Sequence, residues 1–188
     1  IGGDISWAIS LSEAKADFEF INSLPGQKII LKGNHDYWWG TANKINEFLR
    51  DNNFNSIQIL HNNCFSDGNI ALCGTRGWIY DGTGEKDLKI ISREASRLET
   101  SIKLAVDNNL SPTVFLHYPP AYAENVCVEI LNVLKKYNIS TVYYGHIHGK
   151  GIYNVISEYD GIKLKIVSAD SVEFTPQFVS KCQKFEKL

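Results

Sequence analysis

The sequence contains no methionine among its 188 residues, and none of its apolar runs approaches the roughly 20 residues of a membrane-spanning helix. Residues 1–24 also lack the basic segment followed by an apolar core that marks a secretory signal. Neither sign of charge is in excess, since 19 Lys and Arg against 21 Asp and Glu give a formal net charge of −2. These absences exclude a membrane protein. They also weigh against a protein dedicated to long nucleic acids or to a membrane surface.

The missing methionine is informative because a natural chain begins with one. The first residues, Ile1-Gly2-Gly3-Asp4, have the pattern of the end of a buried strand. We therefore expect a single domain over residues 1–188 that lacks its first strand and the helix after it. Cleavage of a signal peptide would also remove the methionine, but a mature chain seldom begins inside a strand.

No two cysteines have the C-x-x-C spacing of a metal or redox site. The four are widely scattered, at Cys64, Cys73, Cys127 and Cys182. A domain of this length can stabilise itself without disulfides. We therefore expect reduced, mostly buried thiols and a cytoplasmic location.

Hydrophobic spacing alternates between the helical and the extended period along the whole chain. A capping box, Ser10-x-x-Glu13, precedes the first predicted helix, and Thr41 can cap the second. The predicted helices cover 14–21, 42–49, 85–108 and 126–134, and residues 81–84 break the chain before the third. The predicted strands cover 28–31, 56–60, 70–73, 113–116, 141–144, 151–157 and 163–168, with Asp160-Gly161 at the last turn. This alternation predicts a layered α/β fold.

Polar residues follow several of these short apolar runs, at the point where each run ends. They are Asp4, Asn34-His35-Asp36, His117, and His146 with His148. In an open α/β sheet the carboxyl ends of the strands form binding sites, so residues far apart in sequence can converge there. Neighbouring glycines permit the close backbone approach that such a site needs.

The residue types in these clusters match a metal site. A carboxylate, an amide oxygen and several imidazoles suit Mn, Fe or Zn. His146 and His148 are two residues apart and point the same way in extended chain. Taken singly, each residue has a structural alternative. Asn34 and Asp36 could form turns, and Asp4 could cap a helix. A lone histidine is usually a hydrogen-bonded structural residue, and we assign His61 to that class. Their joint occurrence at strand ends favours a metal centre.

The segments Gly3-Asp4, Gly33-Asn34-His35-Asp36, His117 and Gly145-His146-Ile147-His148 resemble, in order and spacing, the successive blocks of the calcineurin-like metallophosphoesterase superfamily. Three neighbouring segments are similar to the corresponding segments of a bacterial branch of phosphohydrolases: Ile5-Ser6-Trp7, Tyr37-Trp38-Trp39 and Gly74-Thr75-Arg76-Gly77-Trp78. The resemblance extends from the first residues to Gly149. It implies an α/β fold, a β-sandwich flanked by helices, with the first strand and following helix missing here.

The resemblance also implies a role for each residue of these blocks. Asp4 would bridge two divalent ions of Mn, Fe or Zn. Asn34, His117 and His146 would complete the ligands of the second ion, and His148 would bind the first. A bridging hydroxide would be the nucleophile, because two divalent ions lower the pKa of bound water. His35 would stabilise or protonate the leaving oxygen, and Asp36 would orient and charge the His35 imidazole.

Two departures from the family pattern affect these expectations. The opening Asp-x-His block, which supplies two ligands of the first ion, is absent, so we expect the second site to be better preserved and the chain to be weakly active or inactive. Trp7 stands where many members carry an acidic residue, which affects the tuning of the ligands and not the ligands themselves.

The predicted function is metal-dependent hydrolysis of a small phosphate ester, with no long nucleic acid and no membrane as partner. One alternative is a phosphodiesterase acting on a small or cyclic nucleotide, which needs no basic stripe. Another is a non-catalytic metal-binding module of the same fold. The pair His35-Asp36 favours an enzyme. The four tryptophans, Trp7, Trp38, Trp39 and Trp78, suit ordinary packing or the wall of a pocket, and Arg76 suits either solvent or a substrate phosphate.

Overall fold

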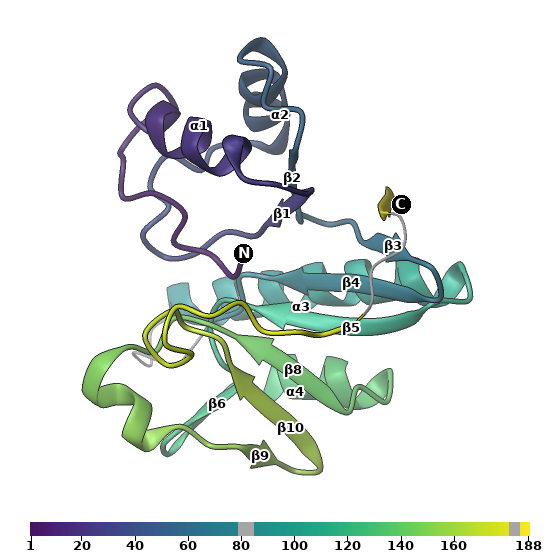
Figure 1. Ribbon diagram of the computed structural model, residues 1–188. Coiled ribbons are helices and arrows are strands. Elements are labelled where there is room, and N and C mark those ends of the chain that lie inside the picture. Colours follow the sequence, from purple (N-terminus) through teal and green to yellow (C-terminus); the bar gives the residue numbers. More distant parts are fainter. Residues whose placement is uncertain (79–84, 181–184) are drawn as a thin grey trace.

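The computed structural model describes residues 1–78, 85–180 and 185–188, and helices and strands alternate along this part of the chain (Figure 1). The helices are α1 (Lys15–Ser23), α2 (Ala42–Asp51), α3 (Glu85–Asp107), α4 (Val128–Lys136) and the 3-10 helix η1 (Gly149–Asn154). The strands are β1 (Lys28–Ile30), β2 (Ile57–Ile59), β3 (Phe65–Asp67), β4 (Ile70–Thr75), β5 (Ser111–Leu116), β6 (Ala121–Tyr122), β7 (Asn125–Val126), β8 (Thr141–Tyr144), β9 (Glu158–Tyr159), β10 (Ile162–Ile166) and β11 (Phe185–Lys187). The predicted mixed α/β fold is confirmed.

The largest sheet has seven strands in the order β11-β3-β4-β5-β8-β10-β9. Its central strands β4, β5, β8 and β10 are parallel, while β3, β9 and β11 pair antiparallel towards the two edges. Strands β1 and β2 form a separate parallel pair, and β6 and β7 form a short hairpin. Parallel strands end at the same edge of their sheet, which brings the residues after β5 and β8 together.

The elements stack in layers (Figure 1). Helices α3 and α4 cover one face of the large sheet, where Val114, Leu116, Val142 and Tyr144 are buried against them. The β1–β2 pair lies across the other face through Leu31, Leu60 and Phe65, and α1 and α2 lie outside that pair. This is a sandwich of two sheets between helices, as the sequence predicts. Among the described residues, no helix is both long and apolar enough to cross a membrane.

Most predicted elements agree with the structure to within a few residues. The predicted capping box lies in the turn before α1: Ser10 Oγ accepts from the Glu13 N–H at 3.3 Å, and the Glu13 carboxylate accepts from the Ile9 N–H at 3.0 Å. The helix itself begins at Lys15, and its N-cap residue Ala14 makes no side-chain capping hydrogen bond. Thr41 caps α2 by accepting from the Lys44 N–H at 3.4 Å. Three of the cysteines are buried free thiols, at Cys64, Cys73 and Cys127, as expected. Cys182 and the predicted break at 81–84 lie outside the described residues.

The predicted strand over 151–157 is wrong. Residues up to Asn154 form η1, and only Glu158–Tyr159 is strand. Ile152 and Val155 pack on the core while Tyr153 is exposed, so the apolar residues recur every third position, the period of a 3-10 helix.

Two short pairings were not predicted. Strand β3 lies inside the turn-rich stretch 61–69 and pairs with β4. Val126, assigned to a helix, belongs to the hairpin β6–β7, and α4 begins two residues later. Such short pairings carry too few residues for a periodic signal, which explains why the sequence did not reveal them.

One residue of α3 also differs from the prediction. Leu88, expected on the buried face of this helix, is half exposed.

A buried carboxylate joins α3 to the end of β4. Glu94 is completely buried, accepts from Thr75 Oγ1 at 2.5 Å and pairs with Arg97 at 2.7 Å. Arg76 lies 3.9 Å from the same carboxylate, with its guanidinium 4.7 Å from the centre of the Trp78 ring. For Arg76 the sequence left solvent and a substrate phosphate as alternatives, and the structure adds a third partner, because the mostly buried guanidinium faces Glu94.

We predict that Glu94→Ala lowers the free energy of unfolding by about 3–5 kcal/mol, because it leaves buried guanidinium groups without a counter-charge. Urea unfolding of the variant measures this loss. Glu99→Ala on the same helix is the matched control, since the exposed Glu99–Lys136 pair contributes about 1 kcal/mol or less. Equal losses in the two variants would contradict the prediction.

Candidate metal centre

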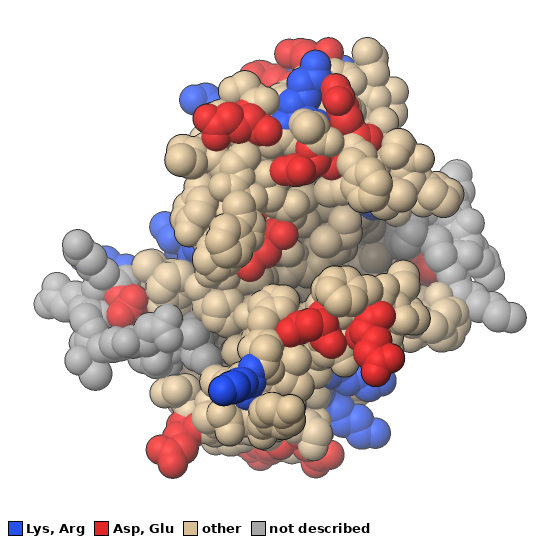
Figure 2. All heavy atoms as spheres, turned by 60° about the vertical axis from the view of Figure 1, so that its left-hand side comes forward, with Lys and Arg blue, Asp and Glu red and all other residues tan. Residues whose placement is uncertain are grey.

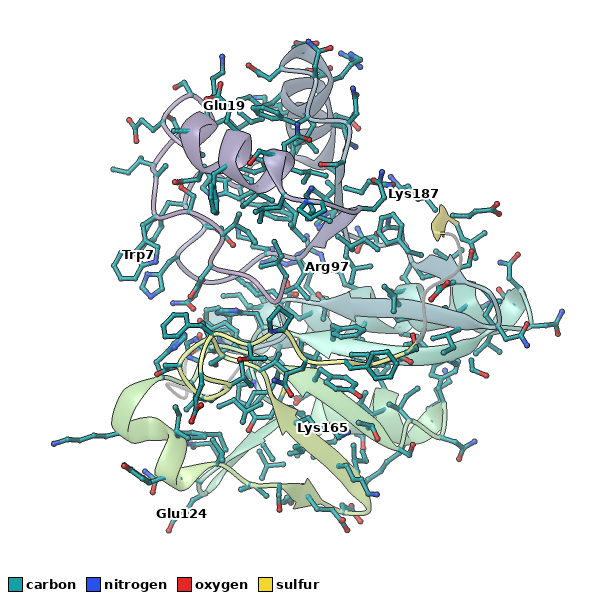
Figure 3. All side chains as sticks on the ribbon, viewed as in Figure 1. Trp7, Glu19, Arg97, Glu124, Lys165 and Lys187 are labelled. Carbon is teal, nitrogen blue, oxygen red and sulfur yellow. The ribbon has the colours of Figure 1, made fainter. Side chains whose placement is uncertain are left out.

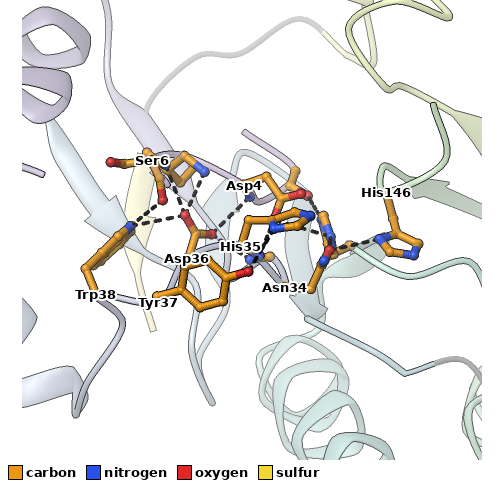
Figure 4. A network of polar contacts seen from close by, with 12 residues as sticks. Asp4, Ser6, Asn34, His35, Asp36, Tyr37, Trp38 and His146 are labelled. Carbon is orange, nitrogen blue, oxygen red and sulfur yellow. Dashed lines mark hydrogen bonds and ion pairs between the residues drawn. The ribbon is translucent and has the colours of Figure 1, made fainter. Parts of the chain in front are cut away.

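Several segments distant in sequence meet beyond the carboxyl ends of β1, β5 and β8. His117 follows β5 and His146 follows β8, and the Gly145 N–H donates to the His117 carbonyl at 3.1 Å. Asn34 follows β1 from the other sheet. Ile1 lies beside β1, because its carbonyl accepts from the Leu31 N–H at 3.2 Å. The loop that begins at Ile1 therefore delivers Asp4 to the same place (Figure 4).

The centre of the cluster is the amide oxygen of Asn34. His117 Nε2 lies 2.6 Å from Asn34 Oδ1, and His146 Nδ1 lies 2.9 Å from it. Asp4 Oδ1 is 3.6 Å from His117 Nε2. Four of the five residues predicted as metal ligands are thus brought together, each by a different segment of the chain.

Both imidazoles of this cluster favour their neutral form. Burial lowers the pKa of His117, and Asp4 only partly offsets this. Burial, followed by the nearby His117 ring, lowers the pKa of His146 to about 4. His117 Nδ1 donates its proton to the Gly2 carbonyl at 2.9 Å, so its Nε2 presents a lone pair towards Asn34. Two acceptors, His117 Nε2 and Asn34 Oδ1, therefore face each other at 2.6 Å, an arrangement that a cation stabilises.

The backbone at this point is strained. Asp4 and His146 have φ angles of 53° and 67°, in the left-handed region that residues with a Cβ rarely adopt. A Cβ on Gly33 would lie 2.0 Å from Asp4 Oδ1, and one on Gly3 would lie 2.5 Å from His117 Nδ1. Such strain is concentrated at functional sites, where the surrounding structure holds it in place.

Among the described residues, no three His, Cys, Asp or Glu side chains are placed to hold a metal ion by themselves. A donor of another kind, the amide oxygen of Asn34, joins the cluster. A carboxylate, an amide oxygen and two neutral imidazoles form the mixed oxygen and nitrogen set that suits Mn, Fe or Zn. The residues present therefore fit a divalent cation.

Among the described residues, no hydrogen bond or ion pair joins His148, predicted as a ligand of the first ion, to this cluster. Its Nδ1 is 2.8 Å from Asp170 Oδ1, and the other oxygen of Asp170 accepts from the Gly149 N–H at 2.7 Å. That N–H, and then His148, lowers the pKa of the Asp170 carboxyl. A carboxylate that contacts one nitrogen of an imidazole commonly orients the other nitrogen towards a metal ion. The contact with Asp170 is compatible with the ligand role of His148, which stays a prediction.

Asp170 was missed by the sequence reasoning. The signal was present, because Asp170 follows the last strand of the parallel set, just as His117 and His146 follow their own strands. It was not singled out because two residues, Ser168 and Ala169, separate it from the apolar run.

Asp36 has partners other than the one expected. Its Oδ1 accepts from the N–H groups of Ile5 (2.7 Å) and Ser6 (3.1 Å) and from Trp38 Nε1 (3.2 Å). Its Oδ2 accepts from the N–H groups of Gly33 (2.7 Å) and Asp4 (3.0 Å). Burial raises the pKa of this carboxyl, and the backbone donors oppose that rise. Among the described residues, no hydrogen bond joins Asp36 to the His35 ring; the structure shows Asp36 holding the loop, and its orienting role towards His35 stays a prediction.

His35 lies next to the cluster on its solvent side. Its N–H donates to Asp4 Oδ1 at 2.9 Å, and its ring nitrogen Nδ1 lies 3.1 Å from the Tyr37 hydroxyl. Its ring stacks on Trp7. The remaining tryptophans serve packing, since Trp38 and Trp39 are buried and Trp78 contacts the core. His61 lies outside the cluster, as expected, 6.4 Å from the Trp39 ring between centroids.

The fold and this cluster define a mixed α/β protein with a candidate cation site at the carboxyl ends of its strands. The family model described as calcineurin-like phosphoesterase matches residues 1–150, so the chain belongs to that family. The family supports hydrolysis of phosphoesters and the use of divalent metal ions in general terms. No curated protein matches the chain significantly. No solved structure does so either.

We predict that Asp36→Asn lowers the free energy of unfolding by about 2–4 kcal/mol, because an amide nitrogen replaces one charged acceptor and faces N–H donors. Thermal or urea unfolding measures this loss. Asp51→Asn, an exposed carboxylate at the end of α2, is the control and should change stability by less than about 0.5 kcal/mol. An Asp36→Asn protein as stable as the parent would show that these hydrogen bonds contribute little.

Proposed function

We propose that this protein is a metal-dependent phosphohydrolase that acts on a small phosphate ester. The observation that carries the proposal is the convergence of His117 and His146 on the Asn34 amide oxygen, with Asp4 beside them. Membership of the calcineurin-like phosphoesterase family supports it independently.

In this proposal Asp4, Asn34, His117 and His146 hold one divalent ion, and Asp4 and His148 contribute to a second. Two such ions supply an activated water and positive charge for the phosphate oxygens. Mn, Fe and Zn all suit these ligands. The Gly2 carbonyl and Asp170 each engage the second ring nitrogen of a histidine, which fixes its orientation.

His35 is the proposed acid for the leaving oxygen. Its backbone is tied to Asp4, and its ring lies at the solvent edge of the cluster, where a substrate oxygen can approach. Asp36 acts one step further away by fixing the loop that carries both Asn34 and His35. An imidazole placed by this loop can donate a proton or a hydrogen bond to the departing group.

The charge distribution supports a small substrate. On the face drawn in Figure 2, the Lys and Arg side chains of the described residues do not form a continuous basic field. Long nucleic acids need rows of cationic side chains along the phosphate backbone. A monoester or a small diester, including a cyclic nucleotide, needs none, so both are included in the assays below.

We predict that the chain binds about one Mn²⁺ tightly and that His117→Ala removes this binding, because it deletes a ligand at the centre of the cluster. Metal analysis after equilibrium dialysis gives the stoichiometry. His61→Ala is the matched control and should bind as the parent does, since His61 lies outside the cluster. Retention of the ion by His117→Ala would overturn the assigned ligand set.

We predict that His35→Ala lowers kcat for p-nitrophenyl phosphate and bis-p-nitrophenyl phosphate by about 10²–10⁴-fold, the usual contribution of a positioned acid. The metal content should stay unchanged, because His35 is not one of the ligands. Which ester is hydrolysed faster separates the monoesterase from the diesterase. Metal binding without hydrolysis of either ester fits both the weak or absent activity expected of this chain and the non-catalytic module.

A further inference from the structure

Trp7 is an exposed indole beside the candidate centre. Its side chain keeps 70% of its accessible surface, whereas Trp38 and Trp39 keep 4% and 7%. In Figure 3 it stands at the outer edge of the molecule, on the loop that enters the centre. It belongs to none of the apolar clusters that hold the layers together. Packing therefore does not explain its position.

One face of the indole is nevertheless engaged. Trp7 stacks on the His35 ring with the centroids 4.2 Å apart and the planes 14° from parallel. The Tyr37 ring, which is 60% exposed, stands edge-on to His35 at 5.9 Å, and its hydroxyl contacts His35 Nδ1. We call Trp7, His35 and Tyr37 the aromatic corner. It lies next to Asp4, through the hydrogen bond from the His35 N–H.

The backbone under this corner is fixed before any ligand arrives. Ser6 donates its N–H to Asp36 and its hydroxyl to Asp17, and its Oγ accepts from the Ala8 N–H. Both residues that flank Trp7 are therefore held, and the stack on His35 limits the indole itself. A rigid ring loses little entropy when a second ring is placed on it.

We propose that the outer face of Trp7 binds a flat aromatic ring of the substrate, a nucleobase or an aryl group, while the phosphoester lies at the metal centre. Stacked rings contact at the distance already seen between Trp7 and His35, and such stacking accepts any planar ring. Selectivity for phosphate esters whose alcohol carries an aromatic ring rests on the proposed phosphohydrolase function. Binding of the ring to Trp7 does not depend on that function.

Binding is tested first without any reaction. Adenosine, which carries no phosphate, is added to the metal-free protein, and saturation-transfer NMR measures which of its protons contact the chain. We expect the signals of the adenine ring to exceed those of the ribose. Trp7→Ala should weaken adenosine binding about tenfold, and Trp7→Phe should retain it. Phe20→Ala, an exposed aromatic on α1, should change nothing. Unchanged adenosine binding by Trp7→Ala would overturn the proposal.

Kinetics then separate binding from positioning. Adenosine monophosphate, phosphotyrosine and ribose 5-phosphate are compared for the parent and for Trp7→Ala. A rise in KM for both aromatic esters but not for ribose 5-phosphate supports the proposal, and a rise for adenosine monophosphate alone identifies a nucleobase. An equal fall in kcat for all three esters, with KM unchanged, would mean that Trp7 only positions His35, which also overturns it. A parent that binds adenosine through Trp7 but hydrolyses no ester fails to support the phosphohydrolase and leaves ring binding standing.

Discussion

The carboxylate of Asp36 is the interaction on which the rest of the site depends. It receives backbone N–H groups from two loops that are about thirty residues apart, one after Ile1 and one after β1. Neither loop has regular structure, so its N–H groups would otherwise be buried without partners. A single charged acceptor satisfies them together, and this places Asp4 and Asn34 side by side. The Asp36 carboxylate therefore has a structural role, which is to hold the two loops together.

Around this anchor the structure favours neutral imidazoles. Burial lowers the pKa of both His117 and His146, and the Gly2 carbonyl accepts a hydrogen bond from His117 Nδ1 on the side facing away from Asn34. The left-handed backbone at Asp4 and His146 is the conformational cost of pointing their side chains at one place. The proposed cation would bind the lone pairs that face one another here.

The fold and most of the ligand cluster could be read from the sequence, because both depend on local signals. Alternating apolar periods gave the helices and the parallel strands, and the rule that sites form at strand ends brought Asn34, His117 and His146 into one hypothesis. The partners of Asp36 could not be predicted, because its contacts are with backbone atoms of a loop about thirty residues away, which leave no trace in residue type. Strand β3 and the hairpin β6–β7 were missed because two or three residues carry no period. The 3-10 helix η1 was misassigned because Ile152, Tyr153, Val155 and Ile156 are β-branched or aromatic residues, the composition typical of a strand.

The position of Trp7 shows how one loop serves two purposes. Its backbone on either side is fixed by polar contacts, Ser6 to Asp36 and Ala8 to Ser6, and these contacts do not depend on the indole. An exposed indole costs hydration of a large apolar surface, and the fold gains no buried area in return beyond the contact with His35. A residue in that situation is explained by what it meets outside the fold. Since the same loop also carries Asp4, a ring stacked on Trp7, as proposed, would be joined to the candidate centre through a few residues of fixed backbone.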